Sequence, residues 1–131
     1  MPKAIRIDAY GGPEVLKLVE VDVPKPEAGE VRIRQHAVGL NFIDIYYRTG
    51  LYKGSLPSGL GFEGAGVVDA VGPRVRHLKV GDRVAYGQSP LGAYAEVRNM
   101  PAAQVVKLPD GISFEEGAAI MLKGLTAQYL F

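Results

Sequence analysis

Glycine and proline interrupt this chain so often that only short segments of regular structure fit between them. The 131 residues include 17 glycines and 9 prolines, which are spread over most of the length. The segments between them have the composition of short strands, and the residues that separate them are typical of turns. A chain of many short strands folds as a sandwich or a barrel. We therefore predict a mainly β domain, in which closure of the sheet would protect the edge strands.

The expected strands follow these breaks, and one of them alternates clearly. We predict strands at residues 4–10, 15–23, 31–37, 64–71, 80–86, 92–98 and 104–108. In the third of these, Arg32, Arg34 and His36 alternate with uncharged residues, so one face of the strand lies in water. Gly81 is placed in a tight turn, where glycine supplies a positive φ angle.

The last part of the chain has the pattern of a helix. Ser113 and Glu116 have the spacing of a capping box, in which each side chain bonds the backbone amide of the other residue. The residues that follow are mostly apolar helix formers without a stop signal. We therefore expect a helix that begins near Phe114 and continues past the last residue, as in a fragment or an engineered form. This divides the chain into a β domain, 1–112, and the start of a connecting helix, 113–131.

Composition and charge exclude several classes of protein. Hydrophobic residues make up 47% and charged residues 22%, as in folded domains. The formal net charge of +1 gives no electrostatic reason to bind nucleic acid or an anionic membrane. Because the chain has no cysteine, disulfides, thiolate metal ligands and a thiol nucleophile are excluded. The sequence shows no signal peptide and no apolar stretch of membrane-spanning length, so we expect a cytoplasmic protein.

Several short motifs occur in an order that is typical of one enzyme superfamily. They lie at residues 11–16, 37–44, 61–66, 80–84, 92–96 and 122–127. Together they resemble the GroES-like N-terminal domain of the medium-chain dehydrogenase/reductase superfamily, in its quinone oxidoreductase and zeta-crystallin branch. The resemblance implies a partly open β-barrel with short helices. It also implies that the C-terminal helix starts the linker to a nucleotide-binding Rossmann domain, which lies outside this sequence.

The chain departs from the superfamily pattern at the positions that bind catalytic zinc. In the zinc alcohol dehydrogenases the Asn41 position is a cysteine, the Phe62 position is a histidine, and a third ligand cysteine falls near Leu122. Zinc is bound by thiolate, imidazole or carboxylate groups, which these side chains do not offer. The lobe that holds a structural zinc in that class is also missing between Gln88 and Gly92. We therefore expect no metal site.

The resemblance implies an NADPH-dependent quinone oxidoreductase that transfers hydride without zinc. A quinone accepts hydride readily, and hydrogen-bond donors can stabilise the negative charge that grows on its oxygen. The implied catalytic residues are Asn41, Tyr46 and Tyr52. The implied cofactor-binding residues are Asn41, Phe42, Ile43, Asp44, Ile45, Tyr46, Thr126 and Tyr129. The chain has no glycine-rich dinucleotide turn, so alone it is expected to bind NADPH weakly and to show no turnover.

These residues also have purely local explanations. Asn41 is typical of loops, where asparagine tolerates unusual backbone angles. Tyr46 and Tyr52 suit a core or rim position as well as a site, since a phenol can stack with its face and donate with its tip. Thr126 and Tyr129 share one face of the helix, where packing explains them nearly as well as a role at the cofactor.

Other polar and aromatic residues are expected to be structural or solvated. Glu63 is predicted to bond backbone groups of its own loop, and Tyr47 is assigned to packing. Lys123 is expected to be solvated on the helix surface. His36 and His77 have no neighbouring ligand or nucleophile in the sequence, so we expect solvated surface positions for both.

Other functions remain compatible with the sequence. A zinc-free reductase that acts on enones, alkenals or acyl thioesters would share this domain and differ mainly in the shape of its pocket. A non-catalytic GroES-like binding module, such as a co-chaperonin-like ring subunit, or a structural crystallin-like protein would share the fold. For a reductase we expect a small quinone or enone substrate, no nucleic-acid or membrane partner, and a homodimer at full length.

Overall fold

The computed structural model describes residues 1–88 and 90–131, which form short strands and two helices. The strands are β1 (Lys3–Ile7), β2 (Lys17–Glu20), β3 (Glu30–Gly39), β4 (Ser58–Gly59), β5 (Glu63–Val71), β6 (Arg83–Tyr86), β7 (Val97–Pro101) and β8 (Val106–Lys107). The helices are α1 (Phe42–Thr49) and α2 (Phe114–Leu130), and the 3-10 turns are η1 (Pro13–Val15) and η2 (Ala102–Gln104).

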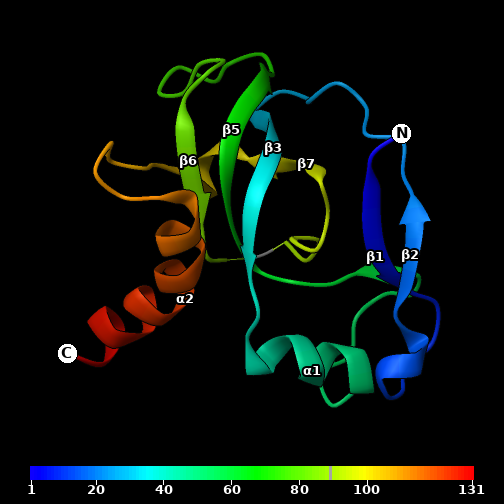
Figure 1. Cartoon of the computed structure of the whole chain (residues 1–131). Helices are drawn as coiled ribbons and strands as arrows, with labels where there is room; N and C mark the ends of the chain where they lie inside the picture. The colour runs from blue at the N-terminus through cyan, green and yellow to red at the C-terminus, as the bar shows by residue number, and fades with distance from the viewer. Residues whose placement is uncertain (89) are drawn as a thin grey trace.

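The strands form two antiparallel sheets. The smaller has three strands in the order β2-β1-β4, and the larger has five in the order β7-β3-β5-β6-β8. Figure 1 shows the larger sheet in the middle of the molecule, with β1 and β2 to one side and α1 below. Since β7 and β8 stand at its two edges, the larger sheet is open. The mainly β, partly open architecture predicted from the sequence is therefore confirmed.

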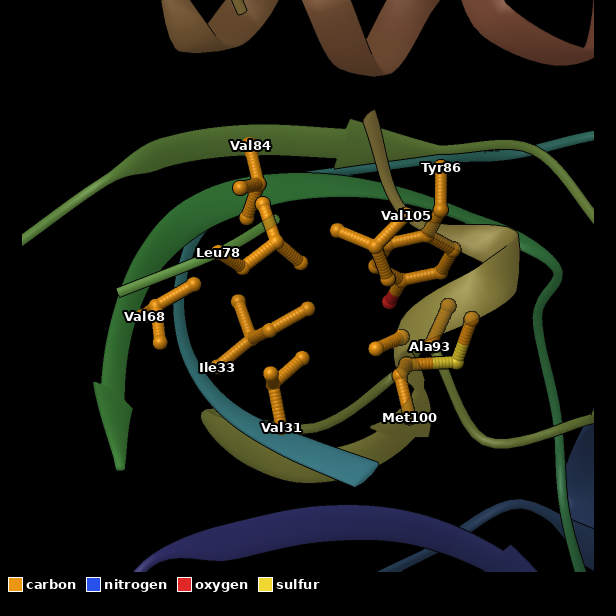
Figure 2. Packing of buried hydrophobic residues seen from close by; sticks show 10 residues of the cluster. Val31, Ile33, Val68, Leu78, Val84, Tyr86, Ala93, Met100 and Val105 are labelled. Carbon is orange, nitrogen blue, oxygen red and sulfur yellow. The ribbon is translucent and has the colours of Figure 1, made fainter. Parts of the chain in front are cut away.

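The larger sheet curls around the main core, as Figure 2 shows. Val31 and Ile33 of β3 are fully buried in it, while Arg34 and His36 on the other face are exposed, which confirms the predicted alternation. Burial of an aliphatic side chain of this size contributes about 1.5–3 kcal/mol. The core therefore holds β3, whose far end carries the candidate site. The main core consists of Val31, Ile33, Val68, Leu78, Val84, Tyr86, Ala93, Met100, Ala102 and Val105.

Residues 92–98 do not form the continuous strand that their composition predicts. The backbone amides of this segment bond several different partners: that of Ala93 donates to Gly61, and that of Glu96 to Lys3. No single neighbour offers a ladder along residues 92–96 within the described part of the chain, so β7 begins only at Val97.

Other predicted strands are present but shorter. The first strand ends at Ile7, and the second is reduced to β2 because η1 occupies the residues before it. The segment 104–108 is divided between the end of η2 and the two residues of β8. The turn predicted at Gly81 is confirmed, since this residue has a φ angle of +94°.

α2 packs on the larger sheet, and α1 lies in the segment that connects β3 to β4. α2 begins at Phe114 behind the predicted capping box, in which the Glu116 amide lies 3.0 Å from Oγ of Ser113. The bonds from Ser113 also hold the pKa of Glu116 below its usual value. α2 packs across β3, β5 and β6, with Gly117 and Ala118 buried. α1 was not located by the sequence patterns. Neither of the helices described has the length and apolar character needed to cross a membrane.

The two histidines occupy exposed positions, as predicted, although each makes a contact. The His36 ring stacks on Phe114 at a centroid separation of 4.3 Å. Nε2 of His77 lies 3.0 Å from the carbonyl oxygen of Ala102. The first contact joins β3 to the start of α2, and the second joins the loop at His77 to η2.

Candidate functional site

The candidate site begins where β3 ends and the chain turns into α1. Asn41 is the N-cap of α1 and has extended backbone angles. Its backbone amide donates to Oδ2 of Asp44 at 3.0 Å, so the Asp44 side chain closes the first turn of the helix. The Asn41 side chain also bonds partners outside α1, namely Glu63 and Lys123.

Glu63 is the fully buried centre to which these partners converge. Its Oε1 accepts from Nδ2 of Asn41 at 2.9 Å and from Nζ of Lys123 at 3.1 Å, and its Oε2 accepts from the backbone amide of Leu122 at 2.8 Å. The prediction that Glu63 bonds its own loop is wrong. A buried carboxylate needs a cation and several donors, and here α1 and α2 supply them.

Lys123 is exposed on the helix surface, as predicted, but its bonds were not predicted. Its ammonium group lies 2.9 Å from Oδ1 of Asn41 as well as 3.1 Å from Glu63, although the side chain is 56% exposed. It is therefore an ordered member of the site, with its head partly in water. Lys123 is the exposed end of a chain of bonds that leads inward to Glu63.

Gly39 shows how closely the site is packed. A Cβ atom on this residue would lie 2.5 Å from the carbonyl oxygen of Ala118 in α2 and closer still to Oε1 of Glu63. A glycine at the end of β3 therefore lets α2 approach Glu63.

Asp44 and Tyr94 extend the network away from α2. The Tyr94 hydroxyl donates to Oδ2 of Asp44, which is 3% exposed, and Oδ1 of Asp44 has no partner among the described residues. Burial raises the pKa of Asp44 above its ordinary value of 3.8, and the bonds from Tyr94 and Asn41 counter this in part. Burial, together with the neighbouring Asp44 carboxylate, also raises the pKa of Tyr94. We call Asn41, Asp44, Glu63, Tyr94 and Lys123 the polar cluster.

The predicted catalytic tyrosines, Tyr46 and Tyr52, belong to a second group, which consists of aromatic side chains. Tyr46 meets Tyr52 edge to face at a centroid separation of 5.3 Å, and Tyr47 contacts both Tyr52 and Phe62, at 5.7 and 5.5 Å. We call these four residues the aromatic cluster. Phe62 is buried and directly precedes Glu63, so this pair of neighbours in sequence links the aromatic cluster to the polar cluster.

The remaining predicted cofactor residues differ in how far they are exposed. Phe42 is 77% and Tyr129 88% exposed, whereas Ile43 and Ile45 are half-buried. The exposed Thr126 donates from its hydroxyl to the carbonyl oxygen of Leu122 at 2.9 Å, one turn earlier in α2. Phe42 and Tyr129 thus offer accessible rings on α1 and α2.

Two hollows adjoin the polar cluster. One of about 320 Å³ lies between the end of β3 and α2, and Lys123 and Leu40 are among its walls. A larger groove of about 570 Å³ lies between β1 and β3, with Tyr94 in its wall. Leu40 lines both hollows, while Lys123 faces the smaller one and Tyr94 the larger.

Comparison with known proteins assigns the domain. The alcohol dehydrogenase GroES-like domain model matches residues 27–110. The chain belongs to the alcohol dehydrogenase GroES-like domain family. The polar cluster thus lies partly inside the matched region and partly in α2, which follows it.

The relatives of this GroES-like domain include several quinone oxidoreductases. The quinone oxidoreductase of Pseudomonas aeruginosa is 59% identical over 131 residues, which are 99% of this chain and 40% of that protein. Quinone oxidoreductase 1 of Escherichia coli is 52% identical, again over 99% of this chain and 40% of its own length. A 2-haloacrylate reductase from a Burkholderia species is 43% identical over 99% of this chain and 41% of its own length. The chain thus spans about 40% of these relatives.

Solved structures agree with the assignment to this family. The Pseudomonas syringae quinone oxidoreductase is 60% identical and matches 99% of this chain and 40% of its own with a TM-score of 0.97. The Escherichia coli quinone oxidoreductase, solved in complex with NADPH, is 52% identical and matches 98% of this chain and 40% of its own with a TM-score of 0.96. The resemblance stated from the motifs is confirmed at the level of the family.

Proposed function

We propose that this chain is the substrate-side domain of an NADPH-dependent quinone oxidoreductase. The observation that carries the proposal is 59% identity to a quinone oxidoreductase along 99% of this chain. The polar cluster gives such an enzyme an ordered ammonium donor beside a hollow, and the aromatic cluster supplies phenol groups. In this proposal residues 1–112 form the substrate domain, and 113–131 lead toward a nucleotide-binding domain. The full-length enzyme is a cytoplasmic homodimer that takes small molecules, not nucleic acid or membranes.

The residues of this chain fit the nicotinamide end of NADPH. Phe42 and Tyr129 expose flat rings that can stack on a nicotinamide, and Thr126 carries a hydroxyl on α2. Asn41, Ile43, Ile45 and Tyr46 would complete the wall from α1. Asp44 is buried, so it would act by holding the turn at Asn41.

Zinc does not fit this site, and we propose that the reaction proceeds without it. Asn41 offers a weakly coordinating amide, and the Glu63 carboxylate already bonds the Lys123 ammonium. A second cation beside that ammonium would be repelled, and thiolate or imidazole ligands are not supplied by Phe62 or Leu122.

The proposed chemistry is the two-electron reduction of a quinone to a hydroquinone. When bound, the reduced cofactor supplies a hydride, and one proton from water completes the product. The protein then has to orient the ring and stabilise the oxygen on which negative charge grows. The hydroxyls of Tyr46 and Tyr52 and the amide of Asn41 are the donors proposed for this purpose.

The test uses a full-length chimera, in which this chain replaces the matching 40% of the Pseudomonas aeruginosa relative. We expect NADPH oxidation that depends on a quinone, whereas the 131-residue chain alone shows none. Tyr46→Phe or Tyr52→Phe should lower kcat about a hundredfold by removing one donor to the developing charge. Tyr47→Phe is the matched control and should leave kcat within twofold. Equal effects of all three changes would show that only ring packing matters.

A second candidate substrate class is that of activated alkenes. It is favoured by the 43% identity to 2-haloacrylate reductase. A panel of quinones, enones and alkenals, each assayed with the chimera, separates the two. A kcat/KM that is highest for an enone or alkenal would assign the alkene class in place of the quinone class. Failure with every acceptor, together with a large ring in solution, would favour a co-chaperonin-like module.

A further inference from the structure

We propose that Lys123 is a further catalytic residue of this site, whose ammonium group donates a hydrogen bond to the substrate oxygen that gains negative charge. The inference deepens the reductase function proposed above and rests on it. Its basis is the arrangement of donors in the polar cluster, where the exposed donor is Lys123 and not Asn41.

Most of the hydrogen-bonding capacity of the Asn41 side chain is used by its neighbours. Its Oδ1 accepts from Lys123 at 2.9 Å, and its Nδ2 donates to Glu63 at 2.9 Å. The residue is 9% exposed, so one remaining N–H is all that it can offer, from a nearly buried position. As the main donor to a substrate, Asn41 is therefore poorly placed.

Lys123 has the properties that Asn41 lacks. A lysine ammonium carries three N–H donors. Two of them go to Asn41 and Glu63, and the third makes no hydrogen bond to the described residues. The side chain is 56% exposed, so this donor can reach a ligand.

The two bonds also fix the ammonium in position before a substrate arrives. A free lysine head is mobile, and ordering it at the moment of reaction would cost conformational entropy. Asn41 and Glu63 hold it from two sides, and Glu63 is itself held by the Leu122 amide at 2.8 Å. Donors that are ordered in advance stabilise developing charge most effectively.

The hollow beside Lys123 has the shape and polarity for a neutral carbonyl compound. Its volume of about 320 Å³ falls near the lower end of the range for small-molecule pockets, about 300–1,000 Å³. Its walls are apolar apart from Lys123 and Glu115, whose charges are opposite. A flat ring against Leu40 and Ala119 would bring its oxygen to the ammonium.

The test compares Lys123→Met with Lys107→Met in the full-length chimera. Lys107 is 62% exposed and also faces a carboxylate, Asp82, at 3.8 Å, so it controls for the loss of an exposed lysine. We expect Lys123→Met to lower kcat for quinone about tenfold to a hundredfold, with KM for NADPH nearly unchanged. Lys107→Met should match the parent chimera. Lys123→Arg should recover a large part of kcat, because it restores a cationic donor.

Chemical rescue supplies a readout that a purely structural lysine would not move. Added ethylammonium should raise kcat of Lys123→Ala in a saturable way and leave the parent chimera unaffected. If Lys123→Met melts early because Glu63 loses its cation, the double variant Lys123→Met with Glu63→Gln removes both charges and should still be slow. A folded variant that keeps kcat within twofold overturns the inference, as does the absence of rescue. A parent chimera that reduces neither quinones nor activated alkenes refutes the proposed function instead.

Discussion

The main core and the polar cluster are both buried, yet different forces hold them. The core packs apolar side chains against one another, so each contributes in proportion to the area that it buries. In the polar cluster, the two carboxylate oxygens of Glu63 accept three hydrogen bonds, from Asn41, Leu122 and Lys123. Removing one partner there leaves the others unsatisfied. The core should therefore weaken by degrees, whereas the cluster keeps or loses its geometry as a unit.

The largest expected change in stability is in the core. Ile33→Ala should lower the free energy of unfolding by about 2–5 kcal/mol, because it removes buried methyl groups and leaves a cavity. Denaturant unfolding of the chain measures this loss. Ile33→Val is the graded control, with an expected loss of about 0.5–1.5 kcal/mol. Equal losses for the two variants would contradict the view that the core responds in proportion to the deleted volume.

A smaller loss is expected where the sheet meets the cluster. Gly39→Ala forces a methyl group against Glu63 and the Ala118 carbonyl, and overpacking of this kind costs about 1–3 kcal/mol. Unlike the core variants, it should also displace Lys123 and lower kcat of the chimera. Gly111→Ala is a suitable control because a Cβ at Gly111 would meet nothing within 4 Å. If Gly39→Ala lost stability but kept full kcat, the cluster would not respond as a unit.

The smallest change is predicted for Asp44 and depends on pH. Burial raises the pKa of Asp44 above the ordinary value of 3.8. Its contribution to stability is therefore greatest below pH 3.8 and is lost as the pH rises through the pKa of the folded state. Both of its bonds fall on Oδ2, so Asp44→Asn can keep them without the charge, while its amide N–H groups replace Oδ1, which has no partner among the described residues. That replacement has the same cost at every pH, so the pH dependence isolates the charge: the melting temperature of the variant relative to the parent should rise between pH 4 and pH 7. A relative melting temperature that falls over this range would show that the carboxylate is favoured in the fold.

The same contrast explains which features were predictable from the sequence. The alternation in β3 and the capping box of α2 arise between near neighbours, so the sequence displays them directly. The polar cluster joins residues that are far apart in the chain, such as Glu63 and Lys123. A signal existed, since each is an isolated charge within an apolar segment. Sequence patterns alone do not reveal that these two charges pair.

The errors in predicting the strand at 92–98 and in missing α1 have related causes. The prediction of a strand at 92–96 was wrong, because strand composition is not enough and a ladder also needs one continuous partner. This segment bonds Lys3, Ile5, Leu60 and Gly61 instead. α1 was missed because its β-branched and aromatic residues also suit a strand. Its ends do carry local signals, since Asn41 and Asp44 have the spacing of a capping box and Gly50 follows the last turn with a φ angle of +86°.

The central claim is that ordered amide, phenol and ammonium donors, and not a metal, stabilise the negative charge that grows on the quinone oxygen. It is tested most directly by the rate of NADPH-dependent quinone reduction in the full-length chimera after exhaustive treatment with a strong chelator. We expect the treated enzyme to keep its full rate and to hold no stoichiometric zinc by elemental analysis. Loss of the rate with recovery on addition of zinc would contradict the account, as would a complete failure to reduce quinones.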